Sequence, residues 1–239
     1  MDILLETRRL ILRRFAESDA GHLFALHNDP EVMRYLNGGK PVPLATIVEE
    51  TLPWFIRSGF YAAIEKSSGD FIGWFHLRPP QGGPADEPEL GYRLHRAAWG
   101  RGYATEGSLA LIDLAFGELG ARRVFAQTMA VNLGSRRVME KCGLRYARTF
   151  FPYWPEPLEG WEQGEVEYEL NRADWHPRSA PPPGSADVLD GDRPGGAGGR
   201  GKEGERRQGG HDQRFRAGAD AGTDGRYERR LHGEPRSAC

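Results

Sequence analysis

The segment WGRGYATEG, residues 99–107, places glycines and one cation directly before a helical pattern. The first N–H groups of a helix lack partners within the helix and carry partial positive charge, so they bind anions. Glycines ahead of such a helix let a phosphate approach the backbone, because no Cβ atom blocks it. We therefore expect Gly100, Gly102 and Ala104 to form an anion cradle, with Arg101 adding positive charge.

Three alternatives compete with this interpretation of the segment. A P-loop requires GxxxxGK, and no lysine occurs between Lys66 and Lys141. A dinucleotide-binding fingerprint requires glycine where Thr105 stands, together with a parallel βαβ pattern that does not surround this segment. A plain glycine-rich turn between a strand and a helix is the simplest alternative for the segment taken by itself.

The elements around the segment predict a mixed α/β domain in the order β-αα-βββ-α-β-α-ββ. Strands are expected at 6–15, 60–66, 71–77, 89–94, 121–131, 144–150 and 165–170. Helices are expected from Ser18 or Asp19 to His27, from Asp29 and Pro30 onward, across 44–57 with Pro53 bending or ending it, over 108–119, and over 135–143. The helix after the glycines is amphipathic, with apolar residues at helical spacing.

Several motifs in this order resemble the GNAT acetyltransferase superfamily, in particular its RimJ/RimL-like branch of ribosomal-protein N-terminal acetyltransferases. The resemblance covers about residues 6–175 and is carried by TRRLILRRF, NDPEVMRYL, ELGYRL, WGRGYATEG, NLGSRRVMEKCGLRY and ELNRADW. It implies a GNAT fold with six or seven strands flanked by helices, splayed between strands 4 and 5. It also implies direct transfer of acetyl from acetyl-CoA to a primary amine, without a covalent enzyme intermediate.

The resemblance assigns roles to the glycine segment and to the residues after the next strand. In this family the loop binds the pyrophosphate of acetyl-CoA through backbone N–H groups, here those of Arg101, Gly102, Tyr103, Ala104 and Thr105. Trp99 stands where much of the family has Gln or Arg, as is common in the RimJ/RimL-like branch. Asn132 resembles the residue that hydrogen-bonds the pantetheine amide, and it is also a good helix cap.

Many relatives place an acidic tyrosine seven residues after that Asn, where this chain has Met139, which cannot donate a proton. Ser135 resembles the serine that some RimL-like enzymes direct at the sulfur, and helix capping is its alternative role. The methionine keeps open a second function, that of a catalytically silent acyl-CoA-binding module.

Deprotonation of the amine requires a base. Glu89 is the first candidate, because the family often carries an acid on this strand, and a solvent-facing carboxylate is the alternative. His76 has a suitable ordinary pKa of about 6.5, although packing is the commoner role for a lone histidine. Glu165 and Glu167 are further candidates. The scattered histidines, with no paired ligand spacing, predict no metal site.

Aromatic side chains of the early helices and strands are expected to line the acceptor groove or, alternatively, to belong to the core: Tyr35, Trp54, Phe55, Trp74 and Trp154. The loop 152–160 carries acids that would attract a cationic amine. The sequence leaves the acceptor open among a protein N-terminus, a polyamine, an amino-acid derivative and an aminoglycoside. It also leaves open whether the chain is a monomer or a homodimer.

Composition divides the 239 residues into two parts, with a formal net charge of −2 for the whole. Residues 1–176 form the predicted acetyltransferase domain, whereas 177–239 are rich in Gly, Arg and Pro and hold few large hydrophobic residues. Such a tail cannot offset its ordering entropy, so we expect disorder. A functional tail that contacts RNA and a frameshift product are both open alternatives. The near-neutral charge argues against a dedicated nucleic-acid partner.

Two cysteines, no signal-peptide pattern and no long apolar run predict a reduced, cytoplasmic protein that does not enter the membrane.

Overall fold

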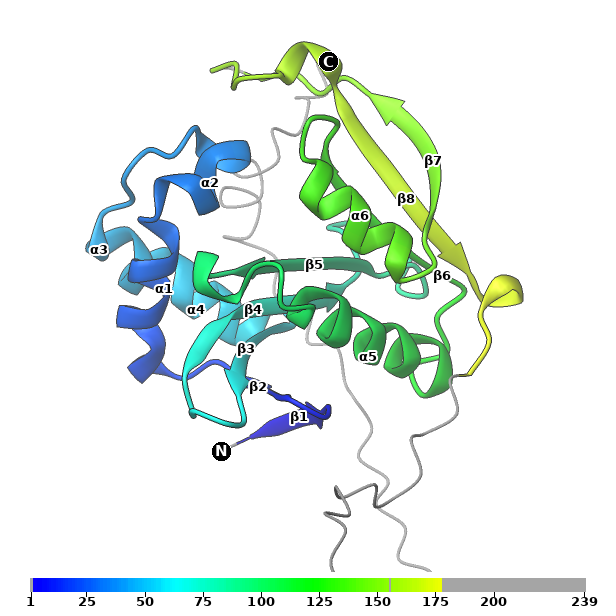
Figure 1. Ribbon diagram of the computed structural model, residues 1–239, viewed down its shortest axis with the longest axis horizontal. Coiled ribbons are helices and arrows are strands. Elements are labelled where there is room, and N and C mark those ends of the chain that lie inside the picture. The colour runs from blue at the N-terminus through cyan, green and yellow to red at the C-terminus, as the bar shows by residue number, and fades with distance from the viewer. Residues whose placement is uncertain (1, 155, 178–239) are drawn as a thin grey trace, which may run out of the picture. The chain divides into compact units, whose positions relative to one another are not determined.

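The computed structural model describes residues 2–154 and 156–177, which form an α/β domain (Figure 1). Its eight strands make one mixed sheet in the order β1-β2-β3-β4-β5-β6-β8-β7. The strands are β1 (Ile3–Glu6), β2 (Leu10–Arg14), β3 (Phe60–Glu65), β4 (Phe71–Arg78), β5 (Glu89–Leu94), β6 (Arg123–Met129), β7 (Arg145–Phe150) and β8 (Glu165–Asn171). Apart from Pro177, the predicted disordered tail lies outside the described residues.

Six α-helical segments accompany the sheet: α1 (Ala20–His27), α2 (Pro30–Asn37), α3 (Leu44–Thr46), α4 (Leu52–Arg57), α5 (Tyr103–Gly117) and α6 (Leu133–Lys141). A π-helical turn, η2 (Ile47–Thr51), joins α3 to α4. Pro53 follows this turn, in the first turn of α4. Proline has no N–H for the regular helical hydrogen bond, which explains why the helix is irregular just before it. The short 3-10 turns are η1 (Glu17–Asp19), η3 (Arg96–Ala98), η4 (Trp161–Gln163) and η5 (Arg172–Asp174).

The sheet has one or two strands more than the sequence predicted, because a separate edge strand precedes the expected N-terminal strand. The backbone turns where Thr7 N–H donates to the Leu10 carbonyl at 2.9 Å. This turn folds β1 back onto β2 in antiparallel register, with Leu5 opposite Leu12. The expected strand over 6–15 is therefore β2 alone, and the residues before it add an edge strand.

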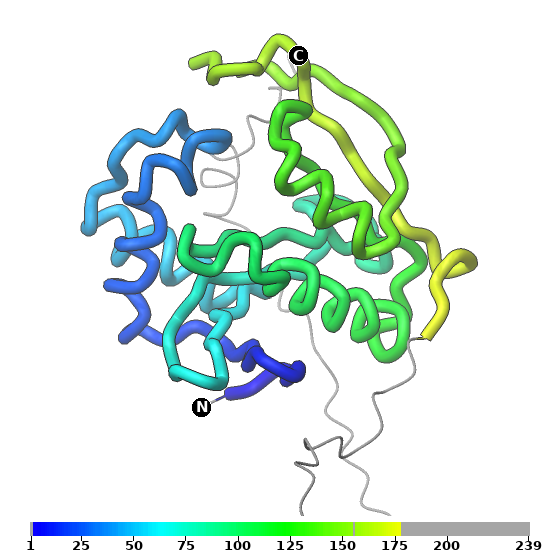
Figure 2. The backbone as a smooth tube through the Cα atoms, in the orientation of Figure 1, coloured from blue at the N-terminus to red at the C-terminus, as the bar shows by residue number. Residues whose placement is uncertain are grey.

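Helices cover both faces of the sheet, as Figures 1 and 2 show with α1–α4 on one side and α5 and α6 on the other. Alternation along β4 explains this division, since neighbouring side chains of a strand point to opposite faces. Phe75 belongs to the apolar cluster that contains Leu111 of α5. Trp74 belongs to the cluster that contains Leu23 of α1 and Phe55 of α4.

Two aspartates begin the early helices in different ways. Asp29 caps α2, its carboxylate accepting the Glu31 N–H at 3.0 Å, as predicted. Asp19 occupies the N-cap position of α1 but makes no capping bond there. Its carboxylate instead accepts the Ala16 N–H at 2.8 Å and pairs with Arg13 at 2.7 Å, which ties the start of the helix to β2.

Candidate active site

A cavity of about 750 Å³ lies among α2, β4, β5, the start of α5, β6 and α6. It adjoins the place where β5 and β6 separate. These two parallel strands pair only at Glu89 and Phe125, while β6 pairs along its whole length with β8. The expected divergence of ELGYRL from VFAQTMAV is therefore present. Beyond the paired position the facing backbone edges of the two strands are available to an extended ligand.

The glycine segment forms the turn that leads into α5. Gly100 and Gly102 have φ angles of +70° and +81°, in the left-handed region that favours glycine. Gly102 is the N-cap of α5, and Tyr103 begins the helix. A Cβ atom on Gly100 would meet no atom within 4 Å, so the approach to the loop backbone is open. Gly102, Tyr103, Ala104 and Thr105 all line the cavity.

The side chain of Arg101 points elsewhere. Its guanidinium lies 3.0 Å from the Glu65 carboxylate, and Arg101 is not among the residues that line the cavity. The Tyr103 hydroxyl donates to the same carboxylate, and this hydrogen bond holds the pKa of Glu65 below its ordinary value. Arg9 completes the cluster, since it lies over the Tyr103 ring and donates to the Arg101 carbonyl at 3.0 Å. The Arg101 side chain thus holds the loop through contacts outside the cavity.

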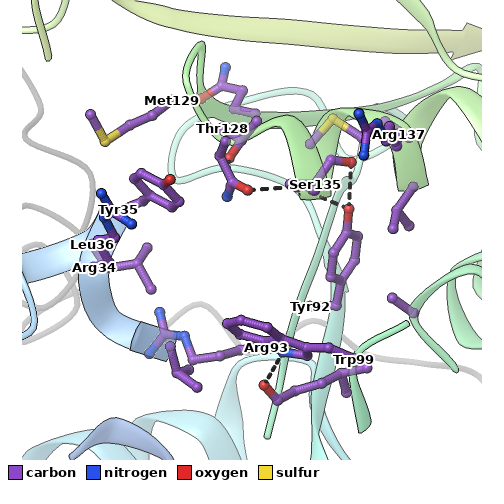
Figure 3. Close-up of a pocket in the computed structure, with 18 of the residues that line it drawn as sticks. Arg34, Tyr35, Leu36, Tyr92, Arg93, Trp99, Thr128, Met129, Ser135 and Arg137 are labelled. Atoms are coloured by element: carbon purple, nitrogen blue, oxygen red, sulfur yellow. Dashed lines mark hydrogen bonds between the residues drawn. The ribbon is translucent and has the colours of Figure 1, made fainter. Parts of the chain in front are cut away.

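Other basic residues reach the cavity. Arg137 and Lys141 lie one turn apart on α6 and line it near the start of α5. Trp99 lines it as well, and its indole N–H donates to the Leu94 carbonyl at 2.8 Å, which fixes the ring at the cavity's edge (Figure 3). Nothing in the sequence distinguished the two α6 cations from an ordinary solvated helix face.

Asn132 and Ser135 stand together at the N-terminus of α6 and line the same cavity. The Asn132 side-chain oxygen accepts the Ser135 N–H at 3.2 Å, so the asparagine is the helix cap. Its amide nitrogen donates to the Thr128 hydroxyl at 3.1 Å. The Ser135 hydroxyl lies 3.0 Å from the Tyr92 hydroxyl, which Figure 3 shows reaching up from β5. Met139 lines the cavity but is otherwise buried.

Sequence reasoning did not single out Tyr92. A signal was present, because Tyr92 shares the strand face of Leu90 and Leu94 and is the one polar-tipped side chain among those three. Its partner comes from α6, more than forty residues further on. Only the packing of α6 against β5 brings the two hydroxyl groups together.

Two glutamates beside the strand opening, Glu89 of β5 and Glu165 of β8, have strongly perturbed pKa values. Burial raises the pKa of Glu165 to about 7, and the neighbouring charge of Glu89 adds to the rise. Burial likewise raises the pKa of Glu89 to about 7 against the opposing charge of Arg78. Glu165 lines the cavity, whereas Glu89 is not among the lining residues. Both groups therefore change charge near neutral pH.

Glu167 does not belong to this pair. Although burial opposes its ionisation, hydrogen bonds from Arg148, Gln127 and Arg123 hold the pKa of Glu167 below its ordinary value. The Arg148 and Arg123 nitrogens lie 2.8 and 2.6 Å from its oxygens. Such a carboxylate stays ionised and paired, so it is a poor proton acceptor.

His76 lines the cavity from β4, packed against the rings of Phe60 and Trp74 at centroid distances of 4.8 and 5.9 Å. The ring lies over the backbone of Gly91 on β5. A Cβ atom at that position would come within 1.9 Å of the His76 Nε2 atom, so only glycine leaves room for the ring. The histidine is thus held rigidly at the wall.

Four of the five aromatic residues expected at the acceptor groove line the cavity: Tyr35, Trp54, Trp74 and Trp154. Phe55 does not, because it is buried in the core and stacks on Phe60 at 3.9 Å between centroids.

The acids of the loop after β7 are paired rather than free. Glu159 accepts from Arg34 at 2.8 Å, and Glu156 pairs with Lys40. These contacts join the loop to α2 and to the residues that follow it. Because each acid already has a cationic partner, the expected attraction of a cationic amine by this loop is not supported.

Nowhere in 2–154 or 156–177 do three or more His, Cys, Asp or Glu side chains gather so that they could hold a metal ion. Among the helices in these ranges, none combines the length and the apolar character needed to cross a bilayer.

Residues 9–145 match the family model described as the acetyltransferase (GNAT) domain. A curated relative, the FsC-acetyl coenzyme A-N(2)-transacetylase of Aspergillus fumigatus, is 34% identical over 182 residues, covering 72% of this chain and 77% of the relative. The acetyltransferase (GNAT family) from Bacillus anthracis has a similar structure, with a TM-score of 0.61 and 21% identity, over 72% of this chain and 99% of that one.

Spermidine N-acetyltransferase from Vibrio cholerae, solved in complex with CoA and spermine, has a TM-score of 0.58 and 16% identity, over 70% of this chain and 98% of its own. The family match spans more than half of this chain, and the described α/β fold agrees with it. This chain belongs to the GNAT acetyltransferase family, and it is an acyltransferase.

Proposed function

We propose that this enzyme transfers acetyl from acetyl-CoA directly to a primary amine, with both substrates held in the cavity beside the β5–β6 opening. The observation that carries the proposal is the meeting of three features in one cavity. These are the bare N-terminus of α5, the hydroxyl of Ser135 and the carboxyl group of Glu165. The helix N-terminus would bind the pyrophosphate, the hydroxyl would protonate the departing thiolate, and the carboxyl group would accept the proton of the amine.

The cofactor site would use backbone more than side chains. The N–H groups of Gly102, Tyr103, Ala104 and Thr105 would bind the pyrophosphate, and Arg101 would contribute its own N–H while its side chain braces the loop. Arg137 and Lys141 would supply the positive charge. The pantetheine arm would pair with the open edges of β5 and β6 as an added strand.

Asn132 would then hydrogen-bond the pantetheine amide while it caps α6. Both roles are compatible, because its side-chain oxygen has a second lone pair and its NH₂ group a second hydrogen.

The reaction needs a proton acceptor on the amine side. Glu165 would take this proton, since it lines the cavity and its pKa of about 7 matches neutral conditions. The charge of Glu89 would add to the effect of burial and so help to keep that pKa high. His76 would position the acceptor as part of the aromatic wall.

Bond changes follow from this placement. The neutral amine nitrogen attacks the carbonyl carbon, the C–N bond forms, and the C–S bond breaks. One proton leaves the nitrogen for Glu165, and one proton reaches the sulfur from the Ser135 hydroxyl, which then regains a proton. This direct transfer needs no acyl group bound to the enzyme. Cys142 is a poor candidate to carry one, because it is buried and its Sγ lies 3.8 Å from the Thr105 carbonyl.

The acceptor belongs to one of several classes of amine. The RimJ/RimL-like resemblance, with Trp99 ahead of the glycine loop, favours a protein N-terminus. The Aspergillus relative is named for N(2) of FsC, so FsC joins the polyamines, amino-acid derivatives and aminoglycosides as a small-molecule candidate.

A thiol-release screen tests the proposal. Purified protein and acetyl-CoA are incubated with N-terminal peptides, polyamines, aminoglycosides and FsC, and released CoA is followed spectrophotometrically. We expect release that matches acetylated product for one class, and loss of that release in Glu165→Gln. The exposed variant Glu118→Gln is the matched control. If acetyl-CoA raises the melting temperature but no class releases CoA, the protein is a silent acyl-CoA-binding module and the proposal is wrong.

A further inference from the structure

The helix that carries Ser135 offers no second proton donor to the cavity at the next turn. Ser135 and Met139 lie four residues apart on the same face of α6, and both line the cavity. A thioether sulfur donates no proton. A departing thiolate at this place therefore depends on the hydroxyl of Ser135 and on whatever group can return a proton to it.

The group in contact with that hydroxyl is Tyr92 of β5. Its phenolic oxygen lies 3.0 Å from the Ser135 Oγ and 3.1 Å from the Ser135 carbonyl oxygen. The phenol has one proton and can donate it to either acceptor. When it donates to Oγ, the serine's own proton is free to point into the cavity, towards the position of the sulfur.

Neighbouring residues hold Ser135 and Tyr92 in place. Asn132 fixes the Ser135 N–H, and Thr128 accepts from the Asn132 amide. Below, the Tyr92 ring packs against Phe75 with 6.2 Å between centroids. Burial raises the pKa of Tyr92 above its ordinary value, so the phenol keeps its proton in any ordinary buffer. Figure 3 shows the two hydroxyl groups meeting at the wall of the cavity.

We propose that Tyr92 acts through Ser135 as the inner member of a two-hydroxyl relay that protonates the departing CoA sulfur. This inference rests on the proposed function. In the step, the C–S bond breaks and its electron pair stays on sulfur. The Ser135 proton moves to sulfur and the Tyr92 proton moves to the serine oxygen. The phenolate then regains a proton from solvent, which balances the proton that Glu165 passes on from the amine.

The competing explanation is that the contact between Tyr92 and Ser135 only stabilises the packing of α6 on β5. In that case, loss of the Tyr92 hydroxyl would affect the stability of the fold, and this effect would be independent of proton transfer by Ser135. A relay would instead make the effects of losing either hydroxyl overlap, since neither group works alone.

The test uses Tyr92→Phe, Ser135→Ala and the double variant, with Tyr146→Phe as a matched control. Tyr146 is an exposed tyrosine on β7 whose hydroxyl contacts Thr149, and it does not line the cavity. Calorimetry measures the affinity of each protein for CoA and for desulfo-CoA, which lacks the sulfur. Wild type and Tyr146→Phe are expected to prefer CoA by about three- to tenfold, the worth of one hydrogen bond.

Both single variants are expected to lose this preference, and the double variant to lose no more than either. With the best acceptor from the screen, Tyr92→Phe is expected to lower kcat by about 10- to 100-fold with an unchanged KM for acetyl-CoA. Adding Tyr92→Phe to Ser135→Ala should change kcat less than twofold. Full additivity, or a Tyr92→Phe protein that keeps both its preference and its kcat, would overturn the relay.

Two further outcomes separate this inference from the proposed function. If Tyr92→Phe does not fold, a Ser135→Ala protein that still prefers CoA over desulfo-CoA overturns the relay by itself. If no amine releases CoA but the preference depends on both hydroxyls, the hydroxyl pair at the sulfur is supported while the proposed acetyl transfer is not.

Discussion

The Arg101 guanidinium lies 3.0 Å from the Glu65 carboxylate, on the side of the glycine loop that faces away from the cavity. The loop's own cation therefore stabilises the turn that the backbone must adopt. In our proposal, the positive charge beside a bound pyrophosphate comes instead from Arg137 and Lys141 of α6, which line the cavity.

From this arrangement we predict different effects for two arginine variants. Arg101→Ala should change the affinity for CoA by less than about threefold, because only its backbone N–H faces the ligand. Arg137→Ala should weaken CoA binding by about tenfold, as expected for one charge-assisted hydrogen bond. Calorimetry at low and high salt measures both, and the Arg137 effect should shrink as salt rises. Equal losses for the two variants would contradict the placement of Arg101.

A second prediction concerns how α5 packs on the sheet. A Cβ atom at Gly107 would lie 2.4 Å from the end of the Phe75 ring, which is fully buried. Gly107→Ala should therefore destabilise the fold by about 1–3 kcal/mol despite alanine's better helix propensity. Gly117→Ala is the control in the same helix, because nothing lies within 4 Å of its Cβ position. Denaturant unfolding should show the control as stable as wild type or more so.

Much of this architecture is visible in the sequence. The hairpin of β3 and β4, the amphipathic α5 and the cap at Asp29 all follow from local patterns, because turn chemistry and apolar spacing act over a few residues. The extra edge strand was missed, since its four residues, two exposed and two partly buried, show no clear alternation.

The site was less predictable for a physical reason. Its residues come together through packing between distant segments, as Tyr92 and Ser135 do. The direction of Arg101 depends on a Glu65 that is thirty-six residues away. Likewise, the raised pKa of Glu165 depends on burial and on Glu89, neither of which local sequence reports.

The glutamate pair predicts a pH dependence of turnover. With a pKa of about 7, Glu165 gains base activity as pH rises, so kcat/KM should rise up to about pH 7 and then level off. Glu89→Gln removes the neighbouring negative charge, so the midpoint of this rise should move to lower pH. Glu165→Gln should lower kcat by about 100-fold or more and abolish the rise. An unchanged midpoint in Glu89→Gln would show that the two carboxyls are not coupled.

The same pair predicts a pH dependence of stability with a definite sign. Folding raises the pKa of each carboxyl from 4.5 to about 7, so the folded state binds protons more tightly than the unfolded state. This stabilisation is complete below about pH 4.5 and is lost as pH rises to about 7. Glutamine imitates the protonated form, so Glu165→Gln should be more stable than wild type at pH 8 by about 1–3 kcal/mol. Unfolding curves at pH 5 and pH 8 measure this, and a variant less stable at pH 8 would contradict it.

The most direct test of the account is the affinity of acetyl-CoA for Gly102→Glu, measured by calorimetry beside Gly69→Glu. Both glycines have similar left-handed φ angles, +81° and +78°, so the two variants bear similar backbone strain. Only Gly102 lies at the start of α5, and Gly69 occupies the turn between β3 and β4. We expect Gly102→Glu to bind acetyl-CoA about 100-fold more weakly or worse, because it puts a carboxylate at the N-terminus of α5, where the pyrophosphate would bind, whereas Gly69→Glu should bind as wild type does. Wild-type affinity in a folded Gly102→Glu protein would contradict the placement of the cofactor at this loop.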